Sequence, residues 1–111
     1  MSKHLKVIEK DLRGATIRAN GEAMGMAVAV TDQEIITGAA GFLWGEKIKR
    51  FPLSAVSSLR TIPNPSANML EIEFAKSAPE SSLTIMYRPE AQSDFERIIT
   101  LLRQRIGTVQ Q

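Results

Sequence analysis

Residues 70–74 read Leu-Glu-Ile-Glu-Phe, and residues 83–87 read Leu-Thr-Ile-Met-Tyr. Apolar residues recur at every second position in both segments, a period typical of a β-strand with one buried face. Residues 76–81 lie between them and are mostly small or polar, as expected of a turn. The pattern predicts a β-hairpin that buries the apolar residues of both segments against each other and against a core.

Five further β-rich runs precede this hairpin. Turn-forming residues separate them, among them Asn20-Gly21, Asp32-Gln33 and residues 63–66 (Pro-Asn-Pro-Ser). Asn-Gly is a strong hairpin signal, so we expect the first turn at residues 20–21. The five predicted strands are residues 15–19, 24–31, 35–39, 47–53 and 56–62.

Two of these strands carry unusual patterns. Gly25, Ala27 and Ala29 give the second strand a face of small side chains, which we expect to meet a close neighbour such as an N-terminal helix or another subunit. In the fourth strand, Ile48 and Phe51 lie three residues apart. Both can face inward only if a β-bulge lies between them.

Helical spacing marks both ends of the chain. Leu5, Ile8 and Leu12 predict a short N-terminal helix within residues 1–13, which Gly14 ends. Residues 91–106 predict a longer helix with one apolar stripe, and Gly107 is expected to end it before a polar tail, residues 108–111. The stripe consists of Ala91, Phe95, Ile98, Ile99, Leu102 and Ile106.

The start of the C-terminal helix has two candidate signals. Ser93 and Glu96 have the spacing of a capping box, whereas Pro89 is suited to the first position of a helix that begins one turn earlier. Leu101 lies about 100° from the centre of the apolar stripe and is expected outside the core.

The order of elements predicts an all-β class with added helices. A single domain, residues 1–111, would contain seven antiparallel strands within residues 15–88, arranged as a small bent sandwich or barrel. The C-terminal helix would cover an open end or face. No helix separates the strands, which excludes parallel βαβ units.

Composition narrows the classes of function. The 111 residues are 43% hydrophobic and 23% charged, as in an ordinary globular domain. The absence of cysteine excludes disulfides, thiolate metal sites and cysteine nucleophiles, and one histidine excludes a histidine metal cluster, so we expect no cofactor or metal. A net charge of +2 does not indicate a nucleic-acid partner. The N-terminal residues lack a continuous apolar run, so we expect no signal peptide and a cytoplasmic location.

Catalysis has little support in the residues. His4 is the single imidazole and lies near the N-terminus, and no phosphate-binding, nucleophile-elbow or zinc-protease motif occurs. Glu71 and Glu73 share one strand face and could mimic a pair of catalytic acids. Alternation along a solvated strand face explains them without chemistry. We therefore expect no enzyme.

Three local segments carry a resemblance to a known family. They are residues 30–36 (Val-Thr-Asp-Gln-Glu-Ile-Ile), 41–48 (Gly-Phe-Leu-Trp-Gly-Glu-Lys-Ile) and 51–56 (Phe-Pro-Leu-Ser-Ala-Val). With the strand count and the terminal helix, the chain resembles the bacterial pleckstrin-homology-like domains over nearly its whole length. It departs from the family at Glu34, where many relatives carry a basic residue. It also lacks, in its C-terminal helix, the tryptophan that eukaryotic pleckstrin-homology helices usually carry; the single tryptophan, Trp44, lies in a loop. The resemblance implies a non-enzymatic interaction module that often self-associates.

Phe42, Leu43 and Trp44 form the most unusual short segment. Three large apolar side chains in a row lie between two glycines, where a loop is normally polar, and their exposure would forgo about 1.5–3 kcal/mol each of burial. The loop could fold back to close the barrel end, form a subunit interface or insert shallowly into a membrane. Leu101 and the small-residue strand face are further candidates for a subunit contact.

Four cations form the alternative candidate site: Arg18, Lys47, Lys49 and Arg50. A polyphosphate headgroup needs several fixed cations, and Lys47 and Lys49 share a strand face. The same lysines could instead protect an edge strand from unwanted pairing. We therefore expect an interaction and assembly module that forms a homo-oligomer with itself and binds an unknown protein partner; the alternative is binding to a membrane surface or an anionic headgroup.

Overall fold

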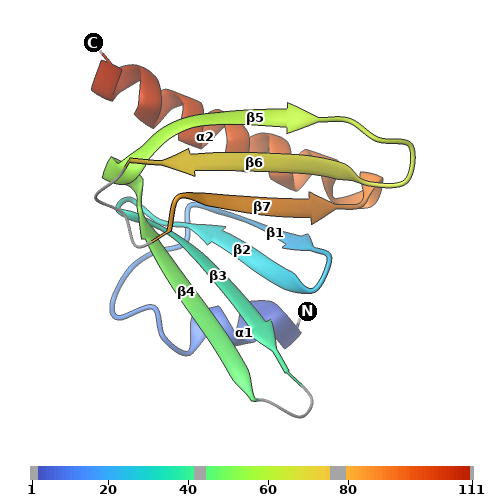
Figure 1. Cartoon of the computed structure of the whole chain (residues 1–111). Helices are drawn as coiled ribbons and strands as arrows, with labels where there is room; N and C mark the ends of the chain where they lie inside the picture. Colours follow the sequence, from blue (N-terminus) through green and yellow to red (C-terminus); the bar gives the residue numbers. More distant parts are fainter. Residues whose placement is uncertain (1–2, 42–44, 76–79, 111) are drawn as a thin grey trace.

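The computed structural model describes residues 3–41, 45–75 and 80–110, with the backbone alone for residues 107–110. The described chain forms two antiparallel sheets (Figure 1). Sheet A has four strands in the order β1-β2-β3-β4, and sheet B has three in the order β5-β6-β7. The Cα radius of gyration is 13.4 Å. The predicted β-rich sandwich with a C-terminal helix and a short N-terminal helix is confirmed.

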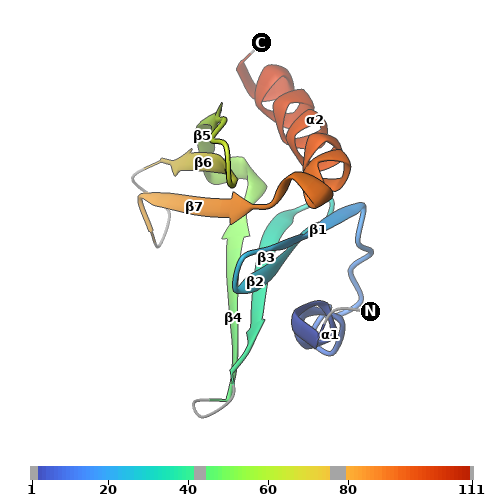
Figure 2. The same cartoon turned by 90° about the vertical axis from the view of Figure 1, so that its right-hand side faces the viewer.

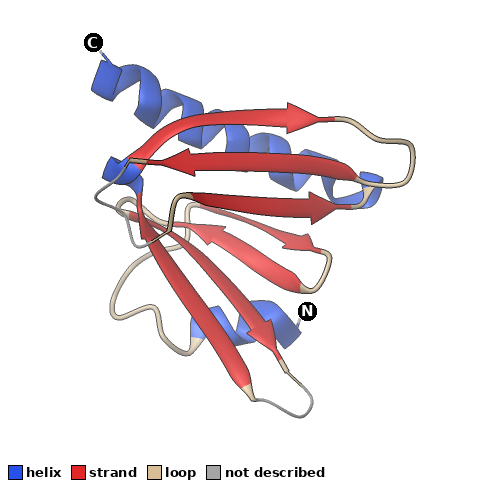
Figure 3. Ribbon diagram, in the orientation of Figure 1, coloured by secondary structure: helices blue, strands red, loops and turns tan. Residues whose placement is uncertain are grey.

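Figure 3 distinguishes helices from strands by colour and shows the two sheets with a helix beside each. Sheet A consists of β1 (Ala19–Ala23), β2 (Met26–Val30), β3 (Glu34–Ala40) and β4 (Glu46–Pro52). The 3-10 turn η1 (Leu53–Ala55) leads to sheet B, which consists of β5 (Val56–Ile62), β6 (Asn68–Phe74) and β7 (Ser82–Tyr87). The remaining elements are α1 (Lys3–Glu9), η2 (Pro89–Ala91) and α2 (Gln92–Gln110).

The main core lies between the two sheets and α2. The predicted hairpin forms as β6 and β7, with Leu70 opposite Ile85 and Ile72 opposite Leu83. Three residues of the α2 stripe, Phe95, Ile98 and Leu102, are fully buried in the same core. Stacked ring pairs join its parts: Phe51 lies 4.9 Å from Phe74, and Tyr87 lies 4.2 Å from Phe95, centroid to centroid.

A second, smaller core lies under α1, on the side of sheet A away from sheet B (Figure 2). Ile8 of α1 packs there on Ala27 and Ala29, so the small-residue face of β2 meets the N-terminal helix. A Cβ atom on Gly38 of β3 would lie 2.6 Å from Cγ1 of Ile8. Small residues on β2 and β3 therefore set how closely α1 can approach the sheet.

Both faces of sheet A are covered, so Ile48 and Phe51 need not face the same core and β4 needs no β-bulge. β3 and β4 pair without a register shift between residues 46 and 52. Phe51 faces the main core, whereas Ile48 faces the α1 cluster. The condition for a β-bulge, that both residues face the same way, is therefore not met.

The predicted first hairpin is wrong in its position. β1 spans Ala19–Ala23, and the turn lies at Met24 and Gly25, where Gly25 has φ +83°. Gly21 lies inside the strand, where a Cβ atom would be 2.7 Å from Cε2 of Phe95. Gly21 therefore permits the close approach of an aromatic ring, and Gly25 provides the turn.

The helix boundaries also differ from the prediction. α1 ends at Glu9, before Gly14, and Arg13 and Gly14 adopt positive φ angles in the connection to β1. η2 begins at Pro89, so the proline signal gives the start of the C-terminal helical region. α2 continues through Gly107 to Gln110. A glycine within a helix costs about 1 kcal/mol relative to alanine, which does not force the helix to end.

Candidate functional site

The four cations predicted to form one patch lie in three places. Lys47 and Lys49 pair across the strands with Ala39 and Thr37, and they share one face of β4. Arg50 points to the opposite face, because successive side chains of a strand alternate. Arg18 precedes β1 and binds Asp32 through two hydrogen bonds of 3.0 and 2.9 Å.

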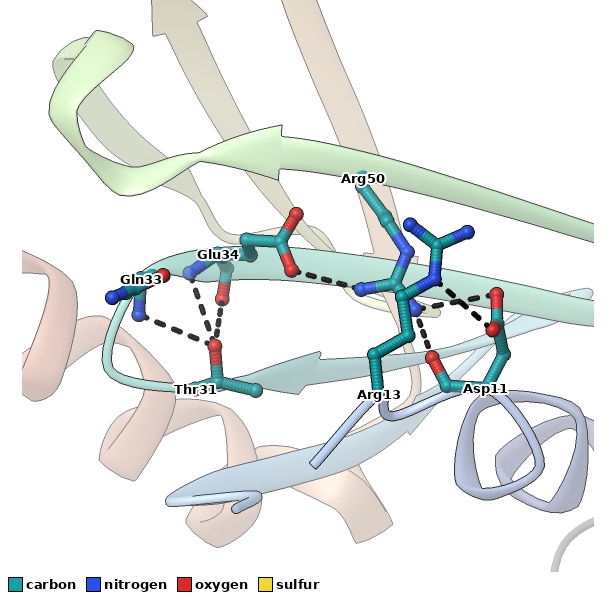
Figure 4. A network of polar contacts seen from close by, with 6 residues as sticks. All are labelled: Asp11, Arg13, Thr31, Gln33, Glu34 and Arg50. Atoms are coloured by element: carbon teal, nitrogen blue, oxygen red, sulfur yellow. Dashed lines mark hydrogen bonds and ion pairs between the residues drawn. The ribbon is translucent and has the colours of Figure 1, made fainter. Parts of the chain in front are cut away.

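Arg50 ties the connection after α1 to sheet A (Figure 4). Its side chain is only 16% exposed, and Nη1 donates to Oε1 of Glu34 at 2.8 Å. Nη2 donates to the backbone oxygen of Asp11 and lies 3.3 Å from Oδ2 of the same residue. Hydrogen bonds from Arg13 and then Arg50 hold the pKa of Asp11 below its ordinary value. The guanidinium of Arg50 is thus engaged in a structural network.

The turn between β2 and β3 is built around Thr31. Its Oγ1 accepts hydrogen bonds from the backbone N–H groups of Gln33 at 3.2 Å and Glu34 at 3.1 Å (Figure 4). Asp32, at the tip, binds Arg18 and lies 3.5 Å from Nη2 of Arg105 in α2. The hydrogen bond from Arg18 lowers the pKa of Asp32. Residues 30–36 therefore form a turn that connects β1, β4 and α2.

Lys49 has a carboxylate partner as well, since its Nζ lies 3.1 Å from Oε1 of Glu80. Within the described part of the chain, Lys47 is the one predicted cation of the four with no ion pair. The structure thus does not bring the four cations together. A headgroup with several phosphates would meet two lysines on this face, one of them already paired.

Phe42, Leu43 and Trp44 lie outside the described residues. The described chain on either side ends the β3–β4 hairpin, where the N–H of Gly41 donates to the backbone oxygen of Gly45 at 2.9 Å. Gly45 has φ +77°. The fourth interface candidate, Leu101, is partly buried and packs against the main core, whereas its position off the stripe had placed it outside.

An apolar row that the sequence reading did not identify crosses the outer face of sheet B. The register places Ile62 opposite Met69 and Met69 opposite Met86, so the three side chains share the face turned away from the core. Met86 is 41% exposed and Met24, in the β1–β2 turn, is 47% exposed. The N–H of Met24 donates to the backbone oxygen of Met86 at 2.8 Å, which joins the turn to the row. We call these four residues the methionine row.

Charged residues of both signs lie beside the methionine row on the same face. The next cross-strand set is Arg60, Glu71 and Thr84, and Nη2 of Arg60 lies 2.7 Å from Oε2 of Glu71. Glu73 lies one set further along β6. The face therefore combines an exposed apolar row with one cation and two anions.

A sequence signal for this row existed. Met69 and Met86 lie at solvent-facing positions of the two most clearly alternating strands. Charged residues such as Glu71 and Glu73 are more usual at such positions. Met24 was expected inside the second strand, because the first turn was placed at residues 20–21, four residues before its position at Met24 and Gly25. Pairing across β5, β6 and β7 could not be read from the separate strands.

His4 contributes to the packing of α1. Its Nδ1 accepts a hydrogen bond of 2.8 Å from the N–H of Ala40 at the end of β3. In residues 3–41, 45–75 and 80–110, no three acidic or histidine side chains are grouped so that they could hold a metal ion. Among the described helices, none has the length and apolar character required to cross a membrane.

Comparison with protein-family models, with curated proteins and with solved structures finds no match to this chain.

Proposed function

We propose that this protein is a non-enzymatic binding and assembly module that pairs with a second copy of itself through the outer face of sheet B. The methionine row is the observation that carries the proposal, because it is an apolar stripe on a face without a covering element among the described residues. The resemblance to bacterial pleckstrin-homology-like domains, with the self-association it implies, and a cytoplasmic location belong to the same proposal.

The charges beside the row favour a second copy as the occupant. A two-fold axis through the outer face of sheet B would place the same surface on both partners, so each Arg60 could approach Glu71 or Glu73 of the other copy. Methionine side chains adapt to irregular apolar surfaces, which suits packing between two copies of one row. An identical copy supplies both the apolar stripe and the complementary charges.

The size of the face sets the extent of the contact. A stable interface buries about 800 Å² on each partner, more than four side chains supply. The contact must therefore extend over the charged set on β5 and β6 and over the β1–β2 turn that carries Met24. Each methionine that becomes fully buried contributes at most about 1.5–3 kcal/mol, and less where it is already partly covered.

Light scattering on the purified chain tests this proposal. The wild type is expected at a mass above the 12.2 kDa of one chain, and Met86→Glu is expected to lower it because a carboxylate would be buried in the contact. Ser54→Glu, at an exposed position in η1, is the matched control and should leave the mass unchanged. A wild type that remains at 12.2 kDa contradicts the proposal.

The sequence-based interface at Phe42, Leu43 and Trp44 remains a prediction that the same assay separates. Trp44→Ser or Leu43→Glu lowers the mass if this loop forms the contact. If sheet B forms it, these variants keep the mass of the wild type while Met86→Glu does not. The light-scattering masses of the loop variants and of Met86→Glu therefore show which of the two surfaces forms the contact.

The alternative, binding to an anionic membrane surface, has one favourable observation: Lys47 and Lys49 share a face of β4. It predicts cosedimentation with anionic phospholipid vesicles that weakens with salt, since exposed charges are screened over about 8 Å at physiological ionic strength. The double variant Lys47→Glu/Lys49→Glu should abolish it. Cosedimentation that is insensitive to both salt and these substitutions would exclude this alternative.

A further inference from the structure

A cavity of about 470 Å³ lies between α2 and one end of sheet B. Its walls come from the end of β5, the start of β6, the end of β7 and the side of α2 that faces them. Figure 1 shows α2 passing behind the three strands of sheet B. Other depressions on the described surface have volumes of about 310–620 Å³, so the residues that line this one, and not its volume, distinguish it.

Tyr87 is one of the residues that line this cavity. The residue is only 4% exposed, and its ring stacks on Phe95 at 4.2 Å. Among the described residues, none forms a hydrogen bond with the Tyr87 hydroxyl, which opens into the cavity. The hydroxyl is accessible from the cavity, so it can form a hydrogen bond with a molecule bound there.

Glu96 supplies a negative charge at the same end of the cavity. A chain of amides fixes its carboxylate: Asn68 Nδ2 donates to Gln92 Oε1 at 3.2 Å, and Gln92 Nε2 donates to Glu96 Oε1 at 3.2 Å. The second carboxylate oxygen of Glu96 is left for another donor. Burial and then the charge of Glu96 raise the pKa of Tyr87, so its hydroxyl stays neutral.

Arg103 supplies a positive charge at the other end of the cavity. It lies seven residues beyond Glu96 on α2, which places both side chains on one side of the helix, about 10 Å apart along its axis. Arg103 forms no ion pair within the described part of the chain, unlike Arg105, which lies beside Asp32. Ile62, Pro63 and Ile99 provide an apolar wall of the cavity.

We infer that this cavity binds a small zwitterion with an apolar middle, its ammonium group held by Glu96 and Tyr87 and its carboxylate by Arg103. The three kinds of lining group match the three parts of such a molecule. A simple amine or a simple carboxylic acid would satisfy one end of the site only. Ile62 belongs to both the cavity wall and the methionine row, whereas Glu96 and Arg103 lie on α2 and outside the row. Variants of Glu96 and Arg103 therefore test ligand binding separately from self-association.

6-Aminohexanoate is the probe, because five methylene groups separate its ammonium group from its carboxylate. Two-dimensional ¹H–¹⁵N NMR of the full chain should show saturable shifts for residues around Tyr87, with a Kd of about 1 mM, as suits a ligand of this size. Hexylamine and hexanoate each lack one charged group, and we expect both to bind at least about tenfold more weakly.

Three variants connect the binding to the proposed contacts. Glu96→Gln and Arg103→Gln should each weaken binding of 6-aminohexanoate about tenfold, and Tyr87→Phe several-fold, since it keeps the ring stack and removes only the hydroxyl. Arg97→Gln is the matched control, because Arg97 lies on α2 outside the cavity and near Asp94. The absence of saturable shifts up to about 20 mM overturns the inference. Equal affinity for the three probes, or equal affinity in all four variants, overturns it as well.

Discussion

Replacing Gly21 with alanine would place a methyl group against the ring of Phe95. The new Cβ atom would lie 2.7 Å from Cε2, 3.0 Å from Cδ2 and 3.2 Å from Cζ, so one edge of the ring is in conflict. The ring has little room to retreat, because its other neighbour is Tyr87, stacked at 4.2 Å. Overpacking of this kind costs about 1–3 kcal/mol, so we expect Gly21→Ala to lower the free energy of unfolding by that amount.

Urea unfolding of four proteins measures the conflict directly: wild type, Gly21→Ala, Phe95→Leu and the double variant. Leucine lacks the ring edge that meets the new methyl group. Gly21→Ala should therefore cost at least about 1 kcal/mol less in the Phe95→Leu background than in the wild type. A turn at residues 20–21, as the Asn-Gly signal predicts, would also make Gly21→Ala costly, but Phe95→Leu would not relieve that cost. If Gly21→Ala lowers the free energy of unfolding by the same amount in the wild type and in the Phe95→Leu background, the reasoning is refuted.

Three further predictions concern the charged network and the core. Arg50→Met should lower the free energy of unfolding by about 1–3 kcal/mol, because it removes the donor to the carboxylate of Glu34 and to the backbone oxygen of Asp11. Urea unfolding measures this, and a change below about 0.5 kcal/mol would contradict the tethering role. Asp11 and Asp32 have lowered pKa values in the folded protein, so the stability they contribute is present above the ordinary pKa of 3.8 and is lost as the pH falls below it. Asp32→Asn should therefore make the thermal stability less dependent on pH between about pH 5 and 2. An unchanged dependence of the melting temperature on pH would contradict this. Phe74→Ala should cost about 3–5 kcal/mol and Leu102→Ala about 2–5 kcal/mol, and a value below about 1 kcal/mol for either would mean that the buried faces are misassigned.

Sequence reasoning predicted well those strands in which apolar residues at every second position determine which face is buried. β6 and β7 have one buried and one solvent-exposed face, and the turn signal at residues 63–66 fixed the end of β5, so their bounds agree closely with the structure. β1 was misplaced because Gly21 was interpreted through its backbone freedom. Glycine is also used where another group packs closely, and the residue that packs on Gly21 lies 74 positions away, so no local pattern could reveal it.

The candidate site was less predictable, for a physical reason. Residues that are neighbours in a strand point to opposite faces, and the partner of a charge is chosen by the register of the sheet. Arg50 was grouped with Lys47 and Lys49, but its carboxylate partners lie 16 and 39 positions away in the sequence. The methionine row arises in the same way, from three strands and a turn whose side chains meet only after pairing.

The central claim is that two copies meet through the outer face of sheet B, and crosslinking at Met69 tests it most directly. The chain has no cysteine, so Met69→Cys introduces a single thiol in the middle strand of that face. A short bismaleimide should join two copies into a species of twice 12.2 kDa at low protein concentration, whereas Ser54→Cys should remain a single chain. Equal crosslinking of both variants, or none at Met69→Cys, would contradict the account.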